Sequence, residues 1–344
     1  MKSLIAMSGG VDSAVSALLT LKNGEPCIGG MMKLFDPSQS DGEETPDAAW
    51  ICEKLGIDFR IFDLREAFRK AVIDRFIDDY SNGRTPNPCV YCNQTMKFGL
   101  LFDEAEKIGA NKLVTGHYAR IQKQGDGFVL LKGIDRFKDQ SYMLYGLTQD
   151  KLARIDFPLG ELQKSDTREI AREHGFVNAE KKESQDICFV PDGDYASVIE
   201  RFRDRKFPEG DFVDEEGNII GRHRGIIRYT IGQRKGLGIT FGKPVYVVNI
   251  DAERNRVVLG SKEALFNDRL KADHFNWMDG KPPHGTIKVM AKIRYNQKEQ
   301  PAVAEATGEG ETEVIFEKPQ RAITSGQSVV IYDGDVVLGG GIIK

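Results

Sequence analysis

The sequence lacks long apolar runs, and this limits where the protein can be. Nowhere in its 344 residues does an apolar stretch approach the ~20 residues that a membrane-spanning helix requires. The N-terminal segment MKSLIAMSGG has a short apolar run that ends in glycines, where a signal peptide needs a longer apolar core. We therefore expect a cytoplasmic protein that does not contact a membrane.

Cysteines are also few, and charge of one sign is not in excess. The five cysteines are an odd number spread over a long chain, which argues against the dense disulfide framework of a small secreted protein. Reduced thiols are expected instead. The net charge of −4 gives no overall attraction to nucleic acid. A nucleic-acid partner would therefore need a local basic surface.

The character of the sequence changes near residue 200. Before it, short apolar runs such as residues 3–7 alternate with helical patterns such as residues 12–22, which predicts an α/β fold with a doubly wound parallel sheet. After it, Gly, Asn and Asp punctuate short β-branched runs, which predicts β-rich domains. We predict a catalytic domain at 1–200, a small β-rich domain at 201–268 and a C-terminal β-barrel at 269–344.

The segment SGGVDS, residues 8–13, lies between the first predicted strand and the first predicted helix. Glycines there allow backbone N–H groups to close around a phosphate at the helix N-terminus. The segment lacks the lysine of a Walker loop, so Asp12 could help to hold Mg²⁺ while the Ser8 and Ser13 hydroxyls meet phosphate oxygens. The alternative is a glycine turn whose serines and aspartate only cap the helix. The motif resembles the phosphate loop of the ATP-pyrophosphatase superfamily, which typically splits ATP between its α and β phosphates.

Cys89 and Cys92 follow the stretch GRTPNP, in which each proline favours an extended backbone. We therefore predict a stiff loop rather than a helix around this pair. The two thiols could bind zinc, form a disulfide or do chemistry. A structural zinc site usually needs a second close pair of ligands, which the sequence does not offer.

Cys188 stands nearly a hundred residues away from this pair. It follows Lys181 and Lys182, whose charge could favour a thiolate. A small buried hydrophobic residue is the plainer interpretation of a lone cysteine between apolar neighbours. Cys27 and Cys52 keep that interpretation.

Six stretches resemble, in order and spacing, the bacterial tRNA-specific 2-thiouridylase (MnmA) family: SGGVDS, GRTPNPCVYCNQTMKF, TGHYAR, KDQSYMLY, KKESQDICF and TIGQRKGLG. The resemblance spans essentially the whole chain and implies an N-terminal sheet of the adenine nucleotide α-hydrolase type. It also implies that ATP adenylylates the 2-oxygen of the wobble uridine in the tRNAs for lysine, glutamate and glutamine. Sulfur from a cysteine persulfide then displaces AMP, and the persulfide sulfur comes from a donor protein or a cysteine desulfurase.

The resemblance assigns the sulfur chemistry to two cysteines. Cys92 matches the family's nucleophile, and Cys188 matches the cysteine that receives sulfur as a persulfide. Either the Cys92 thiolate releases sulfide from the persulfide and leaves a transient Cys92–Cys188 disulfide, or the persulfide attacks the activated carbon and Cys92 resolves it afterwards. Both schemes require the two sulfurs within disulfide reach.

The resemblance also implies the binding residues. Those implied for ATP are Ala6, Met7, Ser8, Gly9, Gly10, Val11, Asp12, Ser13, Met32 and Gly116. Those implied for tRNA are His117, Lys138, Asp139, Gln140, Arg294, Tyr295 and Gln327. Asn87, Pro88 and Cys89 would cradle the flipped target base. Apart from the resemblance, residues 222–243 carry six lysines and arginines, one tyrosine (Tyr229) and no acidic residue, which suits contact with a phosphate backbone.

The chain departs from many family members at Cys89, where they have aspartate. An unperturbed thiol titrates near about 8.5 rather than about 3.9, so it replaces a carboxylate poorly at pH 7. Instead, Cys89, Cys92 and Cys188 could ligate three irons of a [4Fe–4S] cluster and leave the fourth iron open to sulfide. The persulfide relay is the leading hypothesis, the cluster is the alternative, and zinc is the third.

Two other classes of function are compatible with the phosphate loop. A ligase of the same superfamily could adenylylate a small molecule, but this leaves the cysteines and the β-rich half unexplained. A non-catalytic RNA-binding module with a degenerate nucleotide fold predicts binding without ATP turnover.

Overall fold

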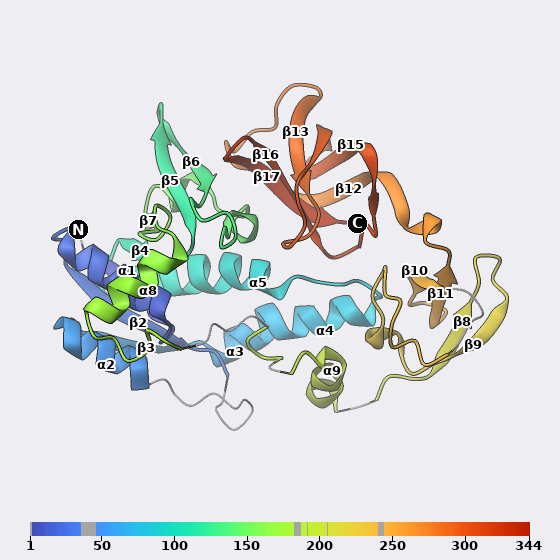
Figure 1. Ribbon diagram of the computed structural model, residues 1–344, viewed down its shortest axis with the longest axis horizontal. Helices are drawn as coiled ribbons and strands as arrows, with labels where there is room; N and C mark the ends of the chain where they lie inside the picture. The colour runs from blue at the N-terminus through green and yellow to red at the C-terminus, as the bar shows by residue number, and fades with distance from the viewer. Residues whose placement is uncertain (1, 36–45, 182–186, 191, 205, 240–243) are drawn as a thin grey trace.

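The computed structural model describes residues 2–35, 46–181, 187–190, 192–204, 206–239 and 244–344. Lys182 and the last four residues of the basic stretch 222–243 lie outside these residues. A parallel sheet flanked by helices forms one end of the molecule, a smaller sheet forms the other, and a β-barrel stands above the helices that join them (Figure 1). In the described part of the chain, no helix has the length and apolar character needed to cross a membrane.

The N-terminal part is built on five parallel strands. They are β1 (Ser3–Ala6), β2 (Cys27–Lys33), β3 (Phe59–Asp63), β4 (Lys112–Val114) and β7 (Ile155–Asp156). Their order is β3-β2-β1-β4-β7, so the direction in which the chain adds strands reverses between β1 and β4. This reversal is the switch point of a doubly wound fold, where ligands bind at the carboxyl ends of the strands. The predicted α/β class is confirmed.

Helices flank this sheet and connect it to the rest of the molecule (Figure 1). They are α1 (Val11–Lys22), α2 (Pro46–Leu55), α3 (Arg65–Phe68), α4 (Asp74–Ser81), α5 (Pro88–Tyr91), α6 (Leu101–Lys107), α7 (Gln149–Leu152), α8 (Lys164–Glu173) and α9 (Tyr195–Arg203). The predicted helix over residues 12–22 is α1, which buries Ala14, Val15 and Leu18 as its apolar spacing requires. The chain turns away at Gly24, whose φ of 76° favours glycine.

Two π-helical segments continue the long helices without a break. The segment η2 (Arg69–Ile73) joins α3 to α4, and η3 (Cys92–Leu100) joins α5 to α6. In a π-helix each N–H bonds to the carbonyl five residues earlier, as the Leu101 N–H does with the Met96 oxygen. Such segments frequently occur at functional sites.

The predicted stiff loop at Cys89 and Cys92 is wrong. The extended stretch ends at Asn87, and α5 begins at Pro88, which occupies the first turn of the helix. Proline is favoured there because its missing N–H has no partner at a helix start and its φ already suits the helix. Cys89 and Cys92 are therefore three residues apart on one helix and share a face.

Six antiparallel strands form the C-terminal barrel, as predicted. They are β12 (Phe266–Trp277), β13 (Ile287–Lys292), β14 (Gln300–Gly308), β15 (Glu311–Arg321), β16 (Ser328–Asp333) and β17 (Val336–Ile343). Pairing of β12 with both β15 and β17 closes the ring. A hairpin of β5 (Ala119–Gln124) and β6 (Gly127–Lys132) from the N-terminal part also pairs with β17, at Leu131 and Val336. No pattern in the sequence predicted this hairpin.

The middle part is a mixed four-stranded sheet. Its strands are β8 (Gly210–Val213), β9 (Ile219–His223), β10 (Tyr246–Asp251) and β11 (Arg256–Gly260), in the order β10-β11-β8-β9. One apolar core joins this sheet to the α3–α4 helix and to Phe189. The Phe189 ring packs edge-on against Phe68 and Phe76, at centroid distances of 5.9 and 5.2 Å. The residue next to Cys188 is thereby anchored.

The barrel is also fixed to the N-terminal part. The Tyr142 hydroxyl, in the short 3₁₀ helix η4 (Ser141–Met143), donates to the carbonyl of Ser328 at 2.7 Å. The Tyr145 hydroxyl lies 3.1 Å from the Ser328 hydroxyl. Both tyrosines are buried in a core that includes Tyr332 of the barrel. Two further 3₁₀ turns, η5 (Ile226–Arg228) and η6 (Glu263–Leu265), complete the described elements.

Candidate active site

A cavity of about 180 Å³ opens at the carboxyl ends of β1 and β4, at the switch point of the sheet. Its lining residues are Ala6, Met7, Ser8, Asp12, Ser13, Gly30, Met32, Lys97, Leu101, Thr115, Gly116, His117 and Gln140. Most of these were predicted as ligands of ATP or tRNA. Gly30, Lys97, Leu101 and Thr115 were not. The fold therefore brings residues from or directly after three strands, and from two helices, α1 and the continuous helix of η3 and α6, to a common site.

The phosphate loop closes upon itself at the start of α1. The Ser8 N–H donates to the Ser13 hydroxyl at 3.2 Å, and that hydroxyl donates to the carbonyl of Gly10 at 2.9 Å. Gly9 has a φ of 74°, which glycine adopts without strain. Within the described residues no side chain caps the N-terminus of α1. The first N–H groups of α1 can therefore receive an anion, which favours the phosphate-loop interpretation over a simple capping turn.

The Asp12 side chain binds a lysine that the sequence did not indicate. Lys164, the first residue of α8, is buried and donates through Nζ to both Asp12 oxygens, at 2.7 and 2.9 Å. The Tyr118 hydroxyl donates to the same carboxylate at 3.0 Å. This lysine comes from a helix 152 residues away in the sequence, and it binds the Asp12 carboxylate without lining the cavity itself. A Mg²⁺ ion at Asp12 would share this carboxylate with Lys164.

Gly116 allows the end of β4 to approach the phosphate loop. A Cβ atom at this position would lie 2.9 Å from the backbone carbonyl carbon and from the Cβ of Asp12, and 3.1 Å from the Ser13 nitrogen. Backbone atoms cannot yield to such a contact without moving the loop. Glycine is therefore required here by close packing, beside the cavity it lines.

His117 lines the cavity as a neutral residue. Its Nδ1 lies 2.6 Å from the Thr115 hydroxyl, and its ring packs between those of Phe98 and Phe157 at 5.7 and 5.6 Å. Burial, and secondarily the charge of Lys97, hold the pKa of His117 well below its usual value. The imidazole therefore carries no charge near pH 7.

Three thiols lie close enough to affect one another electrostatically. Cys89 and Cys188 are exposed and Cys92 is partly buried, and all three are free. The surrounding protein raises the pKa of each thiol, and for Cys188 the neighbouring Cys92 and Cys89 raise it further, to about 12. The fold has brought Cys188 to the helix that bears the other two. The interpretation of Cys188 as a buried hydrophobic residue is wrong, whereas Cys27 and Cys52 are buried, as predicted.

Among the described residues, the cation that acts on all three thiols is Lys97 rather than Lys181. Lys181 pairs with Asp47 at 2.9 Å, so its predicted effect on Cys188 is wrong. Lys97 lowers the pKa of Cys89, Cys92 and Cys188, against the larger effect of burial. It also lines the nucleotide cavity. The sequence did not predict that Lys97 lies near Cys92, because Lys97 follows it by five residues and residue i+5 of an ordinary α-helix faces largely away from residue i.

Comparison with known proteins covers the whole chain. It is 46% identical over 357 residues to the tRNA-specific 2-thiouridylase MnmA of Carboxydothermus hydrogenoformans, across 100% of this chain and 97% of that protein. The chain belongs to the MnmA family of tRNA-specific 2-thiouridylases. Its similarity to the MnmA proteins of Clostridioides difficile (46% over 353 residues, 100% and 98% covered) and Acidithiobacillus ferrooxidans (44% over 345 residues, 100% and 98% covered) is equally extensive.

Three domain families match successive parts of this MnmA-family chain. The tRNA methyl transferase HUP domain matches residues 1–192, the tRNA methyl transferase PRC-barrel domain matches 197–261, and the aminomethyltransferase beta-barrel domain matches 267–343. The sheets of the structure begin within the second and third of these matched ranges or next to them: β8, the first strand of the middle sheet, begins at Gly210, and β12, the first strand of the barrel, begins at Phe266.

Several residues implied for tRNA binding make contacts within the MnmA-family fold. The Gln327 amide donates to the carbonyls of Thr85 and Pro86, at 2.8 and 3.3 Å. Arg294 donates to the Thr324 hydroxyl at 2.6 Å and to the carbonyl of Ile231 at 3.4 Å. These contacts tie the barrel to the stretch before α5 and to the middle part.

The other members of that set differ in their surroundings. The Asp139 carboxylate accepts from the Ser141 hydroxyl at 2.9 Å, so it holds its own loop. Gln140 accepts from the Tyr118 N–H at 3.1 Å and lines the cavity. The Lys138 side chain is partly buried, and Tyr295 packs 6.0 Å from Tyr142.

The residues implied for the target base differ in exposure. Cys89 is exposed and Asn87 is partly buried, with its amide 3.6 Å from the sulfur of Met143. Pro88 is buried and packs inside the protein. Of the three, Asn87 and Cys89 are thus available to a base.

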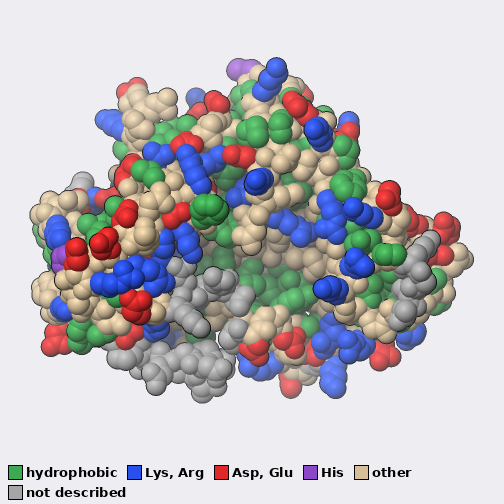
Figure 2. All heavy atoms as spheres, in the orientation of Figure 1, with side chains coloured by type: hydrophobic (Ala, Val, Ile, Leu, Met, Phe, Trp, Pro, Cys, Tyr) green, Lys and Arg blue, Asp and Glu red, His purple; other side chains and the backbone are tan. Residues whose placement is uncertain are grey.

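The basic stretch that begins at residue 222 is partly neutralised. Arg222 pairs with Asp211 at 2.8 Å and Arg228 with Glu200 at 2.8 Å. Tyr229 is buried, so its expected contact with RNA is wrong. Figure 2 nonetheless shows a central hollow on this face of the molecule, with hydrophobic side chains on its floor and lysine and arginine side chains around it.

No group of three or more His, Cys, Asp and Glu side chains is arranged to hold a metal ion, as far as the described residues go.

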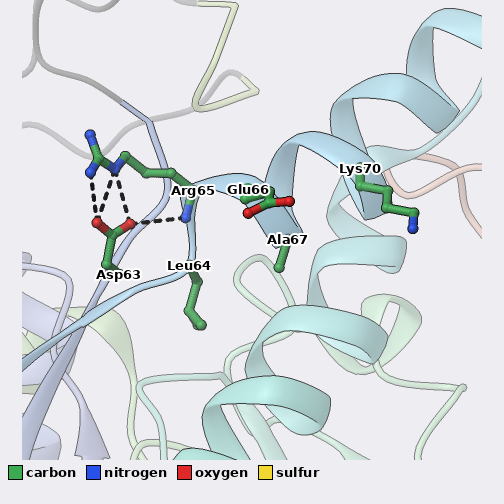
Figure 3. A pocket seen from close by; sticks show the side chains of 6 residues that line it. All are labelled: Asp63, Leu64, Arg65, Glu66, Ala67 and Lys70. Atoms are coloured by element: carbon green, nitrogen blue, oxygen red, sulfur yellow. Dashed lines mark hydrogen bonds and ion pairs between the residues drawn. The ribbon is translucent and has the colours of Figure 1, made fainter.

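A second hollow, of about 650 Å³, opens where α3 begins (Figure 3). It is lined by Asp63, Leu64, Arg65, Glu66, Ala67 and Lys70. Asp63 and Arg65 face each other at 2.7 Å, and hydrogen bonds from Arg65 lower the pKa of Asp63 to about 2. Asp63 and Arg65 thus neutralise each other, and this hollow shares no lining residue with the nucleotide cavity. We therefore assign the hollow no part in the candidate active site.

Proposed function

We propose that this protein is an ATP-dependent tRNA 2-thiouridylase that acts on the wobble uridine of the tRNAs for lysine, glutamate and glutamine. The observation that carries the proposal is that the phosphate loop and the three thiols share one site, because the helix that bears Cys89 and Cys92 also lines the nucleotide cavity through Lys97 and Leu101. Full-length similarity to the MnmA family supports the same conclusion.

In the first step, the 2-oxygen of the uridine attacks the α-phosphate of ATP and pyrophosphate leaves. The loop formed by Ala6, Met7, Ser8, Gly9, Gly10, Val11, Asp12 and Ser13 holds the phosphates, with Met32 and Gly116 beside it. Asp12, which also binds Lys164, is the carboxylate that would help to hold a Mg²⁺ ion, and the ion would offset negative charge on the phosphates. The α1 N-terminus adds its partial positive charge.

In the second step, the terminal sulfur of a Cys188 persulfide forms a bond to C2 of the uridine, and the C2–O bond breaks with its electron pair leaving on AMP. The Cys92 thiolate then attacks the Cys188 sulfur, so that the S–S bond breaks in favour of a Cys92–Cys188 disulfide and the thiocarbonyl is released. A cellular reductant returns both thiols. A persulfide donor protein or a cysteine desulfurase supplies the sulfur.

The tRNA docks on the barrel and the middle domain in this proposal. His117, Lys138, Asp139, Gln140, Arg294, Tyr295 and Gln327 form the contacting set, and Asn87 and Cys89 receive the flipped base. The working domain boundaries are 1–200, 201–268 and 269–344. Since the substrate is tRNA, the protein acts in the cytoplasm.

The test compares AMP and pyrophosphate release with and without unmodified glutamate tRNA. Turnover that depends on tRNA, together with 2-thiouridine in the product, supports the proposal. Turnover without tRNA would favour the small-molecule ligase, and tight tRNA binding without AMP would favour the RNA-binding module.

Anaerobic purification with iron, sulfide and zinc analysis addresses the sulfur route. The relay predicts full activity of metal-free Cys89→Ser, and loss of activity in Cys92→Ser and Cys188→Ser. Activity that is lost in metal-free protein and restored by cluster reconstitution would favour a [4Fe–4S] cluster on Cys89, Cys92 and Cys188.

A further inference from the structure

The nucleotide cavity presents one cation to its contents. Among the described residues that line it, Lys97 is the only lysine or arginine, and His117 is neutral. Asp12 is the single carboxylate of the lining, and it already binds Lys164. The charge of Lys97 is therefore the one available to an anion inside the cavity.

Lys97 also faces the sulfur site. It follows Cys92 by one turn of the π-helix η3, because that helix pairs residue i with residue i+5. Cys89 lies one α-helical turn before Cys92 on the same helix. Lys97 acts electrostatically on both of these thiols and on Cys188. The local π-helical geometry thus turns one ammonium group toward two reacting centres.

Lys97 is partly buried, yet in the described part of the chain no carboxylate pairs with it. Lys112 and Lys132, by contrast, are partly buried and paired, Lys112 with Glu25 and Asp156 and Lys132 with Glu299. A partly desolvated cation without a counter-ion costs stability. Such a cost is expected where a ligand supplies the missing anion.

We propose that the Lys97 ammonium group binds the α-phosphate of ATP, remains on the phosphate of AMP as it leaves, and favours the anionic form of the attacking sulfur. The inference rests on the proposed function and adds a catalytic residue to it. Lys97 keeps its protons throughout, and it offsets negative charge on the leaving group while the C2–S bond forms and the C2–O bond breaks.

The test compares Lys97→Met with Lys97→Arg, which keeps the charge. Lys107→Met is the matched control, since Lys107 lies on the same continuous helix and pairs with Glu104 at the surface. Removing one such stabilising group typically costs about 10²–10³-fold in kcat. We expect a loss of that order in Lys97→Met for both adenylylation and thiolation in single-turnover assays, partial recovery in Lys97→Arg, and no change in Lys107→Met.

A second readout does not depend on turnover. The rates at which iodoacetamide alkylates Cys92 and Cys188 are measured by peptide mass spectrometry at pH 8, in metal-free protein without ATP. The Lys97→Met protein should react several-fold more slowly at both thiols, because it lacks the charge that favours thiolate. A circular dichroism melt confirms that each variant is folded.

The outcomes separate this inference from the proposed function. If the unsubstituted protein releases no AMP with tRNA, the proposed function fails. If the unsubstituted protein is active and folded Lys97→Met matches it in adenylylation, thiolation and alkylation, the role of Lys97 is refuted while the proposed function stands. Slower alkylation with unchanged adenylylation would overturn the assignment to the phosphate.

Discussion

Replacing Lys164 by methionine tests whether the phosphate loop depends on an ion pair from α8. The side chain of Lys164 is 10% exposed and that of Asp12 is 32% exposed. Breaking a fully buried pair costs about 3–5 kcal/mol, and a surface pair contributes about 0–1 kcal/mol. This pair lies between those limits, because Asp12 keeps solvent contact and its hydrogen bond from Tyr118. We expect Lys164→Met to lower the free energy of unfolding by about 2 kcal/mol.

The assay is thermal unfolding followed by a double-mutant cycle with Asp12→Asn. A loss of about 2 kcal/mol corresponds to about 4–8 °C in Tm for a domain of 150–250 residues. The coupling energy should be about 1–2 kcal/mol, because both single variants break the same pair. The affinity for ATP should fall as well, since Asp12 lines the cavity and Lys164 fixes its position.

Lys107→Met is the control, because it removes an exposed lysine from a surface pair with Glu104 and should leave Tm unchanged. A coupling energy below about 0.5 kcal/mol between Lys164 and Asp12 would refute the reasoning, since that is the value of an exposed pair.

Three further predictions follow from the site. Gly116→Ala should lower the affinity for ATP by about tenfold or more, which corresponds to about 1.4 kcal/mol, because a Cβ atom 2.9 Å from the Asp12 backbone moves the phosphate loop. Calorimetric titration with ATP measures this affinity. The control Gly308→Ala, whose Cβ atom would meet only ordinary contacts, should bind ATP normally. Alkylation of Cys188 should keep accelerating above pH 9, because its pKa is about 12; a rate that levels off below pH 8 would contradict this. His117 stays neutral in the folded state, whereas the unfolded chain protonates it below about pH 6.5, so the free energy of unfolding should decrease as the pH is lowered, by up to about 1.4 kcal/mol per pH unit. Urea unfolding at pH 7 and pH 5.5 should show a smaller decrease in His117→Gln than in the unsubstituted protein, and equal decreases would exclude the effect.

The predicted fold came from patterns that are local in the chain. Alternating apolar and helical runs indicate the parallel sheet because side-chain periodicity depends only on nearby residues. The same holds for the phosphate loop, where a strand, two glycines and a helix follow in succession, and for the β-branched runs of the barrel. The family resemblance rests on such contiguous strings, and full-length similarity confirms it.

Errors arose where a local pattern had two outcomes. Proline can extend a chain or begin a helix, and at Pro88 it begins one, so the pair of cysteines lies on a helix face. The π-helical register of η3 likewise depends on packing, and it alone brings Lys97 over Cys92. No periodicity in the sequence distinguishes a π-helix from an α-helix at this length.

The sequence by itself determined the α/β class of the N-terminal part, the β-rich character of the rest and the place of the phosphate loop, because each depends on a short contiguous stretch. The tertiary structure alone decided that Cys188 meets Cys89 and Cys92, that Lys164 supports Asp12, and that Gln327 holds the stretch before α5. Those pairs are separated by some 96 to 242 residues, and such contacts depend on how sheets and helices pack, which short-range pattern does not encode.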